Sequence, residues 1–310
     1  MNLHGRDAWL IRPGALGDAV LTLPAVETLL GAGARRVTVL GTPGSWAWLP
    51  PDEPRVAVRD FGAPEWAALA APGLELPPRA RAALAGVALA VCYLKTGGAH
   101  AVRILEEAGA AHAVAAEPPL AAGPEPIHAS HILLRPLLDA GLKATASAPL
   151  TLGPTPPARN QEPPCLALHP GSGGRRKCWP AERYAELARR AAERFKLRAL
   201  LLAGPADEAA RAAFGEAAHG VAYETLLERP LREVAARLAN CRAFVGNDAG
   251  VTHLAARFCP TLALFGPTDP RVWRPLGPRV EVVRSMAPDG AMDGLAADAV
   301  LDALGRLLAQ

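Results

Sequence analysis

Aromatic residues and unbalanced charge are both scarce in this chain of 310 residues. Aromatic side chains make up 5% of the chain, and the formal net charge is only +3. A protein dedicated to nucleic acid normally carries a concentrated basic stripe and aromatic platforms for the bases. The composition therefore argues against a nucleic-acid partner. The apolar fraction of 50% is enough for full-sized hydrophobic cores and excludes a disordered chain.

Cysteine is also scarce, and its pattern excludes two kinds of site. The five cysteines are odd in number and include no C-x-x-C pair; they are Cys92, Cys165, Cys178, Cys241 and Cys259. Neither a zinc site nor a disulfide framework follows from such spacing. The sequence also has no D-x-D pair to hold a divalent ion. We therefore expect no metal, no cofactor, and a reducing compartment.

Long hydrophobic runs are absent. The longest apolar stretch, Leu84–Leu94, is too short to span a bilayer. Near the N-terminus, Arg6, Asp7, Arg12 and Asp18 interrupt any apolar segment of the kind that a secretory signal needs. We therefore expect a cytoplasmic protein without a transmembrane segment. Any membrane contact would be peripheral, at the inner leaflet of the cytoplasmic membrane.

Short apolar runs alternate with longer helical patterns along most of the chain. In the first half we expect strands at 8–11, 37–40 and 87–92, and helices at 19–30, 99–109 and 128–140. In the second half we expect strands at 165–168, 198–203, 243–245 and 261–265, and helices at 181–195, 207–217, 231–239, 251–257 and 295–308. Such alternation is typical of a parallel sheet with helices on both faces.

A proline-rich segment separates the two halves. Residues 153–164 contain five prolines and can form neither a helix nor a central strand, so we predict a linker. The predicted domains are residues 1–155 and 156–290. A C-terminal helix in residues 291–310 could pack back on the N-terminal domain. Two similar α/β halves indicate two Rossmann-like domains that face a cleft.

Two glycine-rich loops follow predicted strands, which is where open α/β sheets bind ligands. The first, Arg12–Asp18 (RPGALGD), ends on Asp18 at the start of a helix, and a helix cap is the plainer interpretation of this carboxylate. The second, His169–Pro180 (HPGSGGRRKCWP), would let the backbone and Lys177 approach a phosphate. A solvated surface loop is the alternative. We favour phosphate binding, because a strand precedes this loop and a helix follows it.

A third loop, residues 245–253 (VGNDAGVTH), has the same strand–loop–helix pattern. Asp248 could cap the helix, but the free N–H groups of Ala249, Gly250 and Val251 would also form an anion site. His253 would lie in the first helical turn, where a single histidine is more often a core or surface residue than a catalyst.

Two further strand ends carry polar residues of the same kind. Residues 264–273 (LFGPTDPRVW) follow one predicted strand, and residues 204–208 (GPADE) follow another and supply Asp207 and Glu208. Four such ends in one domain indicate a ligand site along one edge of its sheet. Only four lysines occur in the chain, so Lys177 in this setting suggests a compact ammonium group at a phosphate.

Together these motifs resemble those of the bacterial lipopolysaccharide heptosyltransferases, glycosyltransferase family 9. The similar segments are residues 12–25, 169–180, 246–256 and 264–268, in family order. The resemblance implies an α/β protein of the GT-B fold, with two Rossmann-like domains and a cleft between them. The N-terminal domain would lie on the acceptor side, and the C-terminal domain would bind a nucleotide sugar.

The resemblance also implies roles for individual residues. Asp18 would match the general base, and Lys177 the residue that binds the donor phosphate. The other donor-site positions would be Ser172, Asp248, Ala249, Gly250 and His253, with Asp207 or Glu208 on the ribose. The sequence departs from the family at Ala249, where Ser or Thr is usual, so that backbone N–H groups must bind the phosphate there. Residues 93–98 match the family poorly, which leaves the acceptor open.

The implied function is that of an inverting glycosyltransferase. It would move a sugar, heptose first among the candidates, from a nucleoside-diphosphate sugar such as ADP-heptose to lipopolysaccharide or another cell-envelope glycan or glycolipid. Asp18 would deprotonate the acceptor hydroxyl, and Lys177 would stabilise the leaving diphosphate. Two alternatives stay open. One is a nucleotide-sugar 2-epimerase on the same fold, which needs no acceptor. The other is a non-catalytic nucleotide or glycan binder, which has no need of Asp18 as a base.

Overall fold

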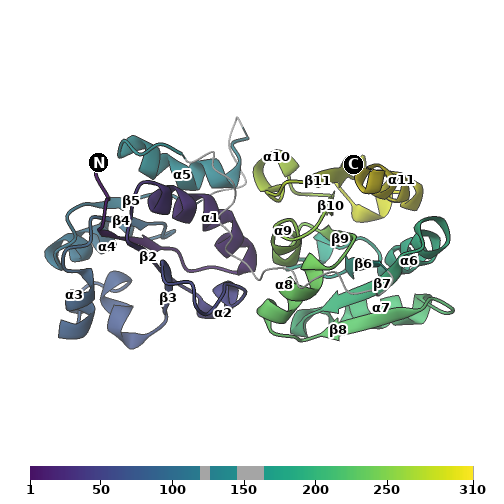
Figure 1. Cartoon of the computed structure of the whole chain (residues 1–310), viewed down its shortest axis with the longest axis horizontal. Coiled ribbons are helices and arrows are strands. Elements are labelled where there is room, and N and C mark those ends of the chain that lie inside the picture. The colour runs from purple at the N-terminus through teal and green to yellow at the C-terminus, as the bar shows by residue number, and fades with distance from the viewer. Residues whose placement is uncertain (119–125, 145–163, 310) are drawn as a thin grey trace. The chain divides into compact units, whose positions relative to one another are not determined.

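A computed structural model of the chain describes residues 1–118, 126–144 and 164–309. The chain divides into two compact units, Met1–Leu152 and Gly153–Gln310 (Figure 1). This division lies close to the predicted boundary after residue 155. The predicted proline-rich linker lies outside the described residues, apart from Pro164.

The first unit is built on a five-stranded parallel sheet in the order β3-β2-β1-β4-β5. Its strands are β1 (Asp7–Ile11), β2 (Arg36–Gly41), β3 (Val56–Asp60), β4 (Leu89–Cys92) and β5 (Ala113–Ala115). The central strands β1 and β4 are buried on both faces, as is usual for parallel strands. This is why their sequences are continuous apolar runs rather than alternating patterns.

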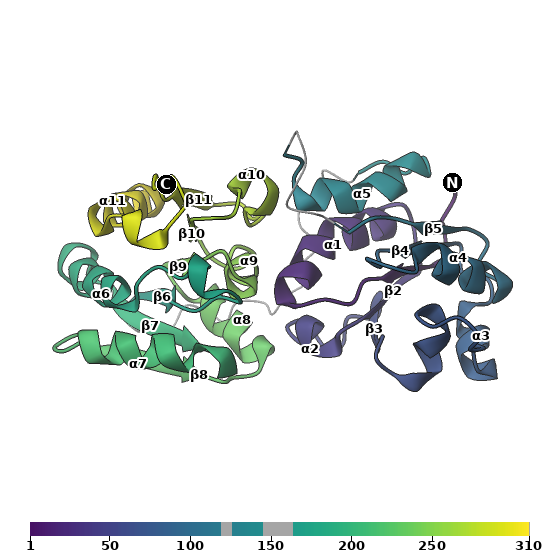
Figure 2. The same cartoon turned by 180° about the vertical axis from the view of Figure 1, so that it is seen from behind.

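Helices cover both faces of the first sheet. They are α1 (Leu16–Gly31), α2 (Pro43–Trp46), α3 (Pro78–Leu84), α4 (Gly98–Glu107) and α5 (Ala129–Asp139), with a 3-10 helix η1 at Pro64–Leu69. One face packs against η1, α3 and α4 in a single core cluster. Helices α1 and α5 pack against each other and lie together on the other side of the sheet in both views (Figures 1 and 2).

The second unit contains a six-stranded parallel sheet in the order β11-β10-β9-β6-β7-β8. Its strands are β6 (Cys165–His169), β7 (Arg198–Ala203), β8 (Tyr223–Leu227), β9 (Ala243–Asn247), β10 (Thr261–Phe265) and β11 (Val280–Arg284). Counted within each unit, both sheets begin with the doubly wound order 3-2-1-4-5, and β11 adds a sixth strand to the second. The order therefore reverses between β1 and β4 and again between β6 and β9, which are the points where such sheets bind ligands.

The helices of the second unit form two layers. They are α6 (Ala181–Phe195), α7 (Glu208–Ala217), α8 (Leu231–Ala239), α9 (Gly250–Ala255), α10 (Pro270–Trp273) and α11 (Ala297–Ala309), with 3-10 helices η2 (Arg175–Lys177), η3 (Pro205–Asp207) and η4 (Met292–Gly294). Helices α6, α7 and α11 lie on one side of the sheet, and α8 and α9 lie on the other (Figures 1 and 2).

The C-terminal helix α11 belongs to the core of the second unit. Its buried residues join α6 and the strands in one cluster; they are Val300, Leu301, Ala303, Leu304 and Leu307. Their spacing of three and four residues produces one apolar face, and that face is used against α6 and β11. The expectation that this helix also packs back on the N-terminal domain stays a prediction.

The described residues include no helix that is long and apolar enough to cross a membrane. Most predicted elements are present within a few residues of their predicted ends. The strands β3, β5, β8 and β11 were not predicted. All four are edge strands, and most of their residues are partly or fully exposed, so they lack the long buried apolar run that marks a central strand.

The packing of α11 can be tested with Leu304→Ala. Leu304 is fully buried, so its truncation should lower the free energy of unfolding by about 2–5 kcal/mol, measured by chemical denaturation. The control is Asp302→Ala on the same helix. Asp302 is exposed and pairs with Arg194 at 3.2 Å, a contact worth less than about 1 kcal/mol. Equal losses in the two variants would contradict the packing.

Candidate functional site

The candidate site of the second unit lies where β6 and β9 end side by side. These two strands are neighbours, with His169 opposite Gly246 in the register. The loops that follow them carry most of the residues singled out from the sequence. Because the strand order reverses between β6 and β9, the helices on either side of this point diverge and leave room for a ligand.

Asn247 is the side chain that ties these two loops together. It is completely buried. Its Nδ2 donates hydrogen bonds to the carbonyl oxygens of Pro170 and Gly171 at 2.8 and 3.1 Å. Its Oδ1 accepts from the backbone N–H of Trp179 and from the hydroxyl of Tyr184, both at 3.0 Å. Both donors and both lone pairs of the amide are thus used, so the residue fixes the loop rather than binding a ligand.

Two predicted donor-site residues, Ser172 and Lys177, both contact a third, Asp248. The Lys177 Nζ lies 2.9 Å from Asp248 Oδ2, and the Ser172 hydroxyl donates to the Asp248 carbonyl oxygen at 2.9 Å. The Thr268 hydroxyl donates to the same Oδ2 at 2.8 Å. Asp248 is buried, whereas the Lys177 side chain is 35% exposed. The Lys177 side chain is therefore held by Asp248 and remains partly exposed.

The structure corrects the interpretation of Asp248 as a helix cap, and it adds Thr268 to the residues around Asp248. Asp248 is not the helix cap of α9, because the cap position is Ala249, which has no side-chain acceptor. Gly250 begins that helix, and His253 lies buried within it. Thr268 belongs to a motif that was noted in the sequence, but its contact with Asp248 was not predicted. A contact between residues twenty positions apart leaves no local signal in the sequence.

The two carboxylates considered for the ribose have different surroundings. Asp207 is buried, and its Oδ2 lies 3.0 Å from His169 Nε2 and accepts from the Gly204 N–H at 2.8 Å. Burial alone would raise the pKa of Asp207, but these two contacts outweigh it and hold the pKa below its usual value. Glu208 is exposed at the first position of α7.

Gly171 lies directly against the Asp207 carboxylate. A Cβ at position 171 would come within 1.7 Å of Asp207 Oδ1. Asp207 has little freedom to move, because His169 and Gly204 hold its other oxygen. The glycine is therefore required by the close approach of β6 and β7 at their ends, and Asp207 is first of all a structural link between them.

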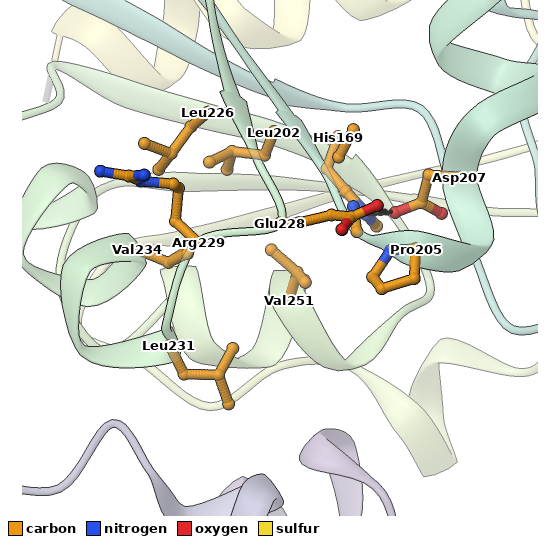
Figure 3. Close-up of a pocket in the computed structure, with 12 residues that line it drawn as sticks. His169, Leu202, Pro205, Asp207, Leu226, Glu228, Arg229, Leu231, Val234 and Val251 are labelled. Atoms are coloured by element: carbon orange, nitrogen blue, oxygen red, sulfur yellow. Dashed lines mark hydrogen bonds and ion pairs between the residues drawn. The ribbon is translucent and has the colours of Figure 1, made fainter.

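A pocket of about 380 Å³ adjoins this link (Figure 3). Its walls are mostly apolar side chains, namely Leu202, Pro205, Leu226, Leu231, Val234 and Val251, and its polar lining comes from His169, Asp207, Glu228 and Arg229. In Figure 3 the Glu228 side chain points toward the His169–Asp207 pair. An apolar pocket with a few convergent polar groups is the usual form of a small-molecule site.

Glu228 is an acidic lining residue that the sequence analysis did not single out. It follows the unpredicted strand β8, and its backbone is in the left-handed region, with φ +48. Its N–H donates to the Ala203 carbonyl oxygen at 2.9 Å, which holds it at the end of the sheet. A non-glycine residue in this conformation costs free energy and is common at ligand sites. Glu228 is thus a second carboxylate in the lining of the pocket, in addition to Asp207, and is a further candidate for contact with a ribose.

Asp18 lies in the corresponding loop of the first unit, after β1. Its Oδ1 is 2.6 Å from Arg12 Nη2, and its Oδ2 accepts from the Ala15 N–H at 3.0 Å. Arg12 is buried, whereas the Asp18 side chain is 34% exposed. Helix α1 begins at Leu16 with Ala15 at its cap position. Asp18 is therefore at the third helical position and is not the cap.

No group of three or more histidine, cysteine or acidic residues in the described part of the chain could hold a metal ion. The polar side chains of the two loops include an ammonium group and hydroxyls in the second unit, and a carboxylate paired with an arginine in the first.

Gly171→Ala tests the packing of the second-unit loop. The added methyl group should collide with Asp207 and lower the free energy of unfolding by about 1–3 kcal/mol, seen as a lower melting temperature. Gly173→Ala is the matched control, because a Cβ there meets nothing within 4 Å. A Gly171→Ala protein as stable as the Gly173→Ala protein would contradict the close approach.

Comparison with known proteins identifies the family. The model of "Glycosyltransferase family 9 (heptosyltransferase)" matches residues 111–293. That range is more than half of the chain. It contains all the candidate donor-site residues of the second unit, from Ser172 to His253, and it does not reach Asp18.

Individual relatives agree with this match. The chain is 33% identical over 128 residues to lipooligosaccharide heptosyltransferase 2 of Haemophilus influenzae, across 40% of this chain and 37% of that relative. The match thus spans little more than a third of the relative's length.

Solved structures resemble the whole chain. A glycosyltransferase family 9 protein from Veillonella parvula has a TM-score of 0.82 at 18% identity, over 100% of this chain and 99% of that one. An Escherichia coli heptosyltransferase solved with ADP has a TM-score of 0.69 at 21% identity, over 97% and 99%. At such identities the likeness concerns the fold, and it confirms the predicted GT-B class of two Rossmann-like domains. With more than half of its residues matched by the family model, the chain belongs to glycosyltransferase family 9, the heptosyltransferase family.

Proposed function

We propose that this protein transfers a heptose from a nucleoside-diphosphate heptose, with ADP as the nucleotide, to a lipopolysaccharide or related cell-envelope glycan. The observation that carries the proposal is the cluster of Lys177, Ser172, Asp248 and Thr268 beside the pocket at the β6–β9 edge. The family membership supports the type of reaction. The E. coli relative solved with ADP supports the nucleotide.

The donor would lie across the pocket and the cluster. The pocket is lined by His169 and Val251, which come from the same two loops that carry the cluster. A nucleoside in the pocket would thus have its diphosphate near Lys177. An ammonium group has three N–H donors, and the contact with Asp248 uses one of them. The others would bind phosphate oxygens, while Glu228 and Asp207 would be the carboxylates nearest to the ribose.

The reaction would be an inverting displacement at the anomeric carbon. An acceptor hydroxyl has a pKa far above 7 and needs a base as its bond to the sugar forms. Asp18 would be that base, and the buried guanidinium of Arg12 would fix the orientation of its carboxylate. The diphosphate gains negative charge as it leaves. Lys177 would stabilise this charge most strongly in the transition state, which is what accelerates a reaction.

One incubation separates this function from its alternatives. The purified protein is mixed with ADP-heptose and a heptose-free lipopolysaccharide core, and product is followed by mass spectrometry. Heptose on the acceptor, with one ADP released for each heptose transferred, is the expected result. Conversion of the sugar nucleotide without acceptor would instead indicate an epimerase, and tight ADP binding with no turnover would indicate a binder.

Lys177→Ala should weaken ADP binding. Removal of one charge-assisted contact costs about 1.5–3 kcal/mol, or roughly tenfold to a hundredfold in Kd, measured by calorimetry. Lys143→Ala, at an exposed lysine of the first unit, is the control and should bind ADP as the original chain does. Equal affinities in the two variants would remove Lys177 from the donor site.

Asp18→Asn should abolish transfer and leave ADP binding unchanged. The amide keeps the size of the side chain but cannot take a proton, so the turnover rate should fall about a hundredfold to ten-thousandfold. Asp52→Asn, at an exposed aspartate of the same unit, controls for the loss of charge. Transfer by Asp18→Asn at the rate of the control would disprove the role as base. Loss of ADP binding in Asp18→Asn would point to a structural role.

A further inference from the structure

Three cysteines lie in a row along the edge of the second sheet that is opposite to the donor loops. Cys165 is the first residue of β6, and Cys241 and Cys259 come just before β9 and β10. The strand order β10-β9-β6 makes these three strands neighbours. All strands are parallel, so their starts share one edge, while Lys177 and Asp248 follow strand ends at the other edge.

Two of these thiols are close enough to react with each other. The Sγ atoms of Cys165 and Cys241 lie 3.0 Å apart. The backbone next to them is held in register, because the Arg242 N–H donates to the Cys165 carbonyl oxygen at 2.8 Å. A disulfide has a length of about 2.05 Å, so the two sulfur atoms need to approach by only about 1 Å. Cys165 is half-buried, and Cys241 is buried.

The surroundings give the two thiols different roles. The hydrogen bond with Cys241 lowers the pKa of Cys165 despite its burial, and the neighbouring Arg237 lowers it further, although Glu224 opposes this. The same hydrogen bond, together with burial, raises the pKa of Cys241 far above its usual value. Thiolates are the attacking species in disulfide exchange. Cys165 is thus the thiol that reacts first, and it is also the more accessible one.

We propose that Cys165 and Cys241 are a reversible disulfide site, oxidised by small-molecule disulfides. The Cys165 thiolate attacks one sulfur of the oxidant, forms a mixed disulfide and releases one thiolate, which takes up a proton. Cys241 then loses its proton and attacks the Cys165 sulfur, and the second thiolate leaves and takes up that proton. Two protein thiols and one oxidant disulfide thus become one protein disulfide and two small thiols.

The bridge would join the start of β6 to the start of β9 across a long stretch of chain. A cross-link of this kind restricts the unfolded state more than the folded one. Oxidation should therefore raise the melting temperature by several degrees, and a reductant should reverse the rise. The donor loops at the opposite edge would not be altered.

The test is incubation of the full chain with oxidised glutathione, followed by peptide mapping without reductant. The expected result is a linked pair of peptides that contain Cys165 and Cys241, with the mass of two hydrogen atoms lost. In Cys241→Ser, glutathione should remain attached to Cys165. Cys178→Ser is the matched control, since Cys178 is also half-buried, and it should form the bridge as the original chain does.

Three outcomes would overturn the proposal: unlinked Cys165 and Cys241 after complete oxidation, a bridge from either residue to Cys259, or loss of the bridge in Cys178→Ser. Peptide mapping of the original chain decides the matter even where a variant fails to fold.

Discussion

The candidate donor site depends on one buried amide. Asn247 holds the loop after β6 through two carbonyl oxygens, and it holds the start of α6 through Trp179 and Tyr184. With these contacts in place, Ser172 and Lys177 reach Asp248 from the neighbouring strand. A fully buried side chain that forms four hydrogen bonds is costly to replace, since each partner left unpaired would remain desolvated without a hydrogen bond. The polar cluster is therefore set before a ligand arrives.

Strands could be predicted from the sequence where burial on both faces produces a continuous run of apolar residues. Strands β1, β4, β6 and β9 are buried on both faces, so they form short apolar runs, and the loops at their ends could be located from glycine and charge alone. The edge strands β3, β5, β8 and β11 have mostly partly or fully exposed residues and were missed. Glu228 was missed with β8, because a carboxylate can be assigned to a strand end only after the strand itself has been predicted.

Side-chain partners were harder to predict than positions. Asp18 and Asp248 both looked like helix caps, yet the cap positions are Ala15 and Ala249, which offer no side-chain acceptor. The Asp18 carboxylate accepts from the N–H of the cap residue Ala15 and pairs with Arg12, and the Asp248 carboxylate pairs with Lys177. Asp207 and Glu208 are adjacent in the sequence, but one is buried and the other exposed. The contacts of Asp207 with His169 and Gly171 explain its burial, and they join strands β6 and β7, which are distant in the sequence.

The indole of Trp179 is a fluorescent group within the candidate donor site. It is almost fully buried, its ring N–H donates to the Leu295 carbonyl oxygen at 2.9 Å, and its backbone N–H is held by Asn247. It comes two residues after Lys177 and is one of six tryptophans in the chain. Its own emission should be blue-shifted, because the ring is buried, and should change when the loop moves. The part of the fluorescence that is lost in Trp179→Phe is therefore an intrinsic signal for movement of the loop.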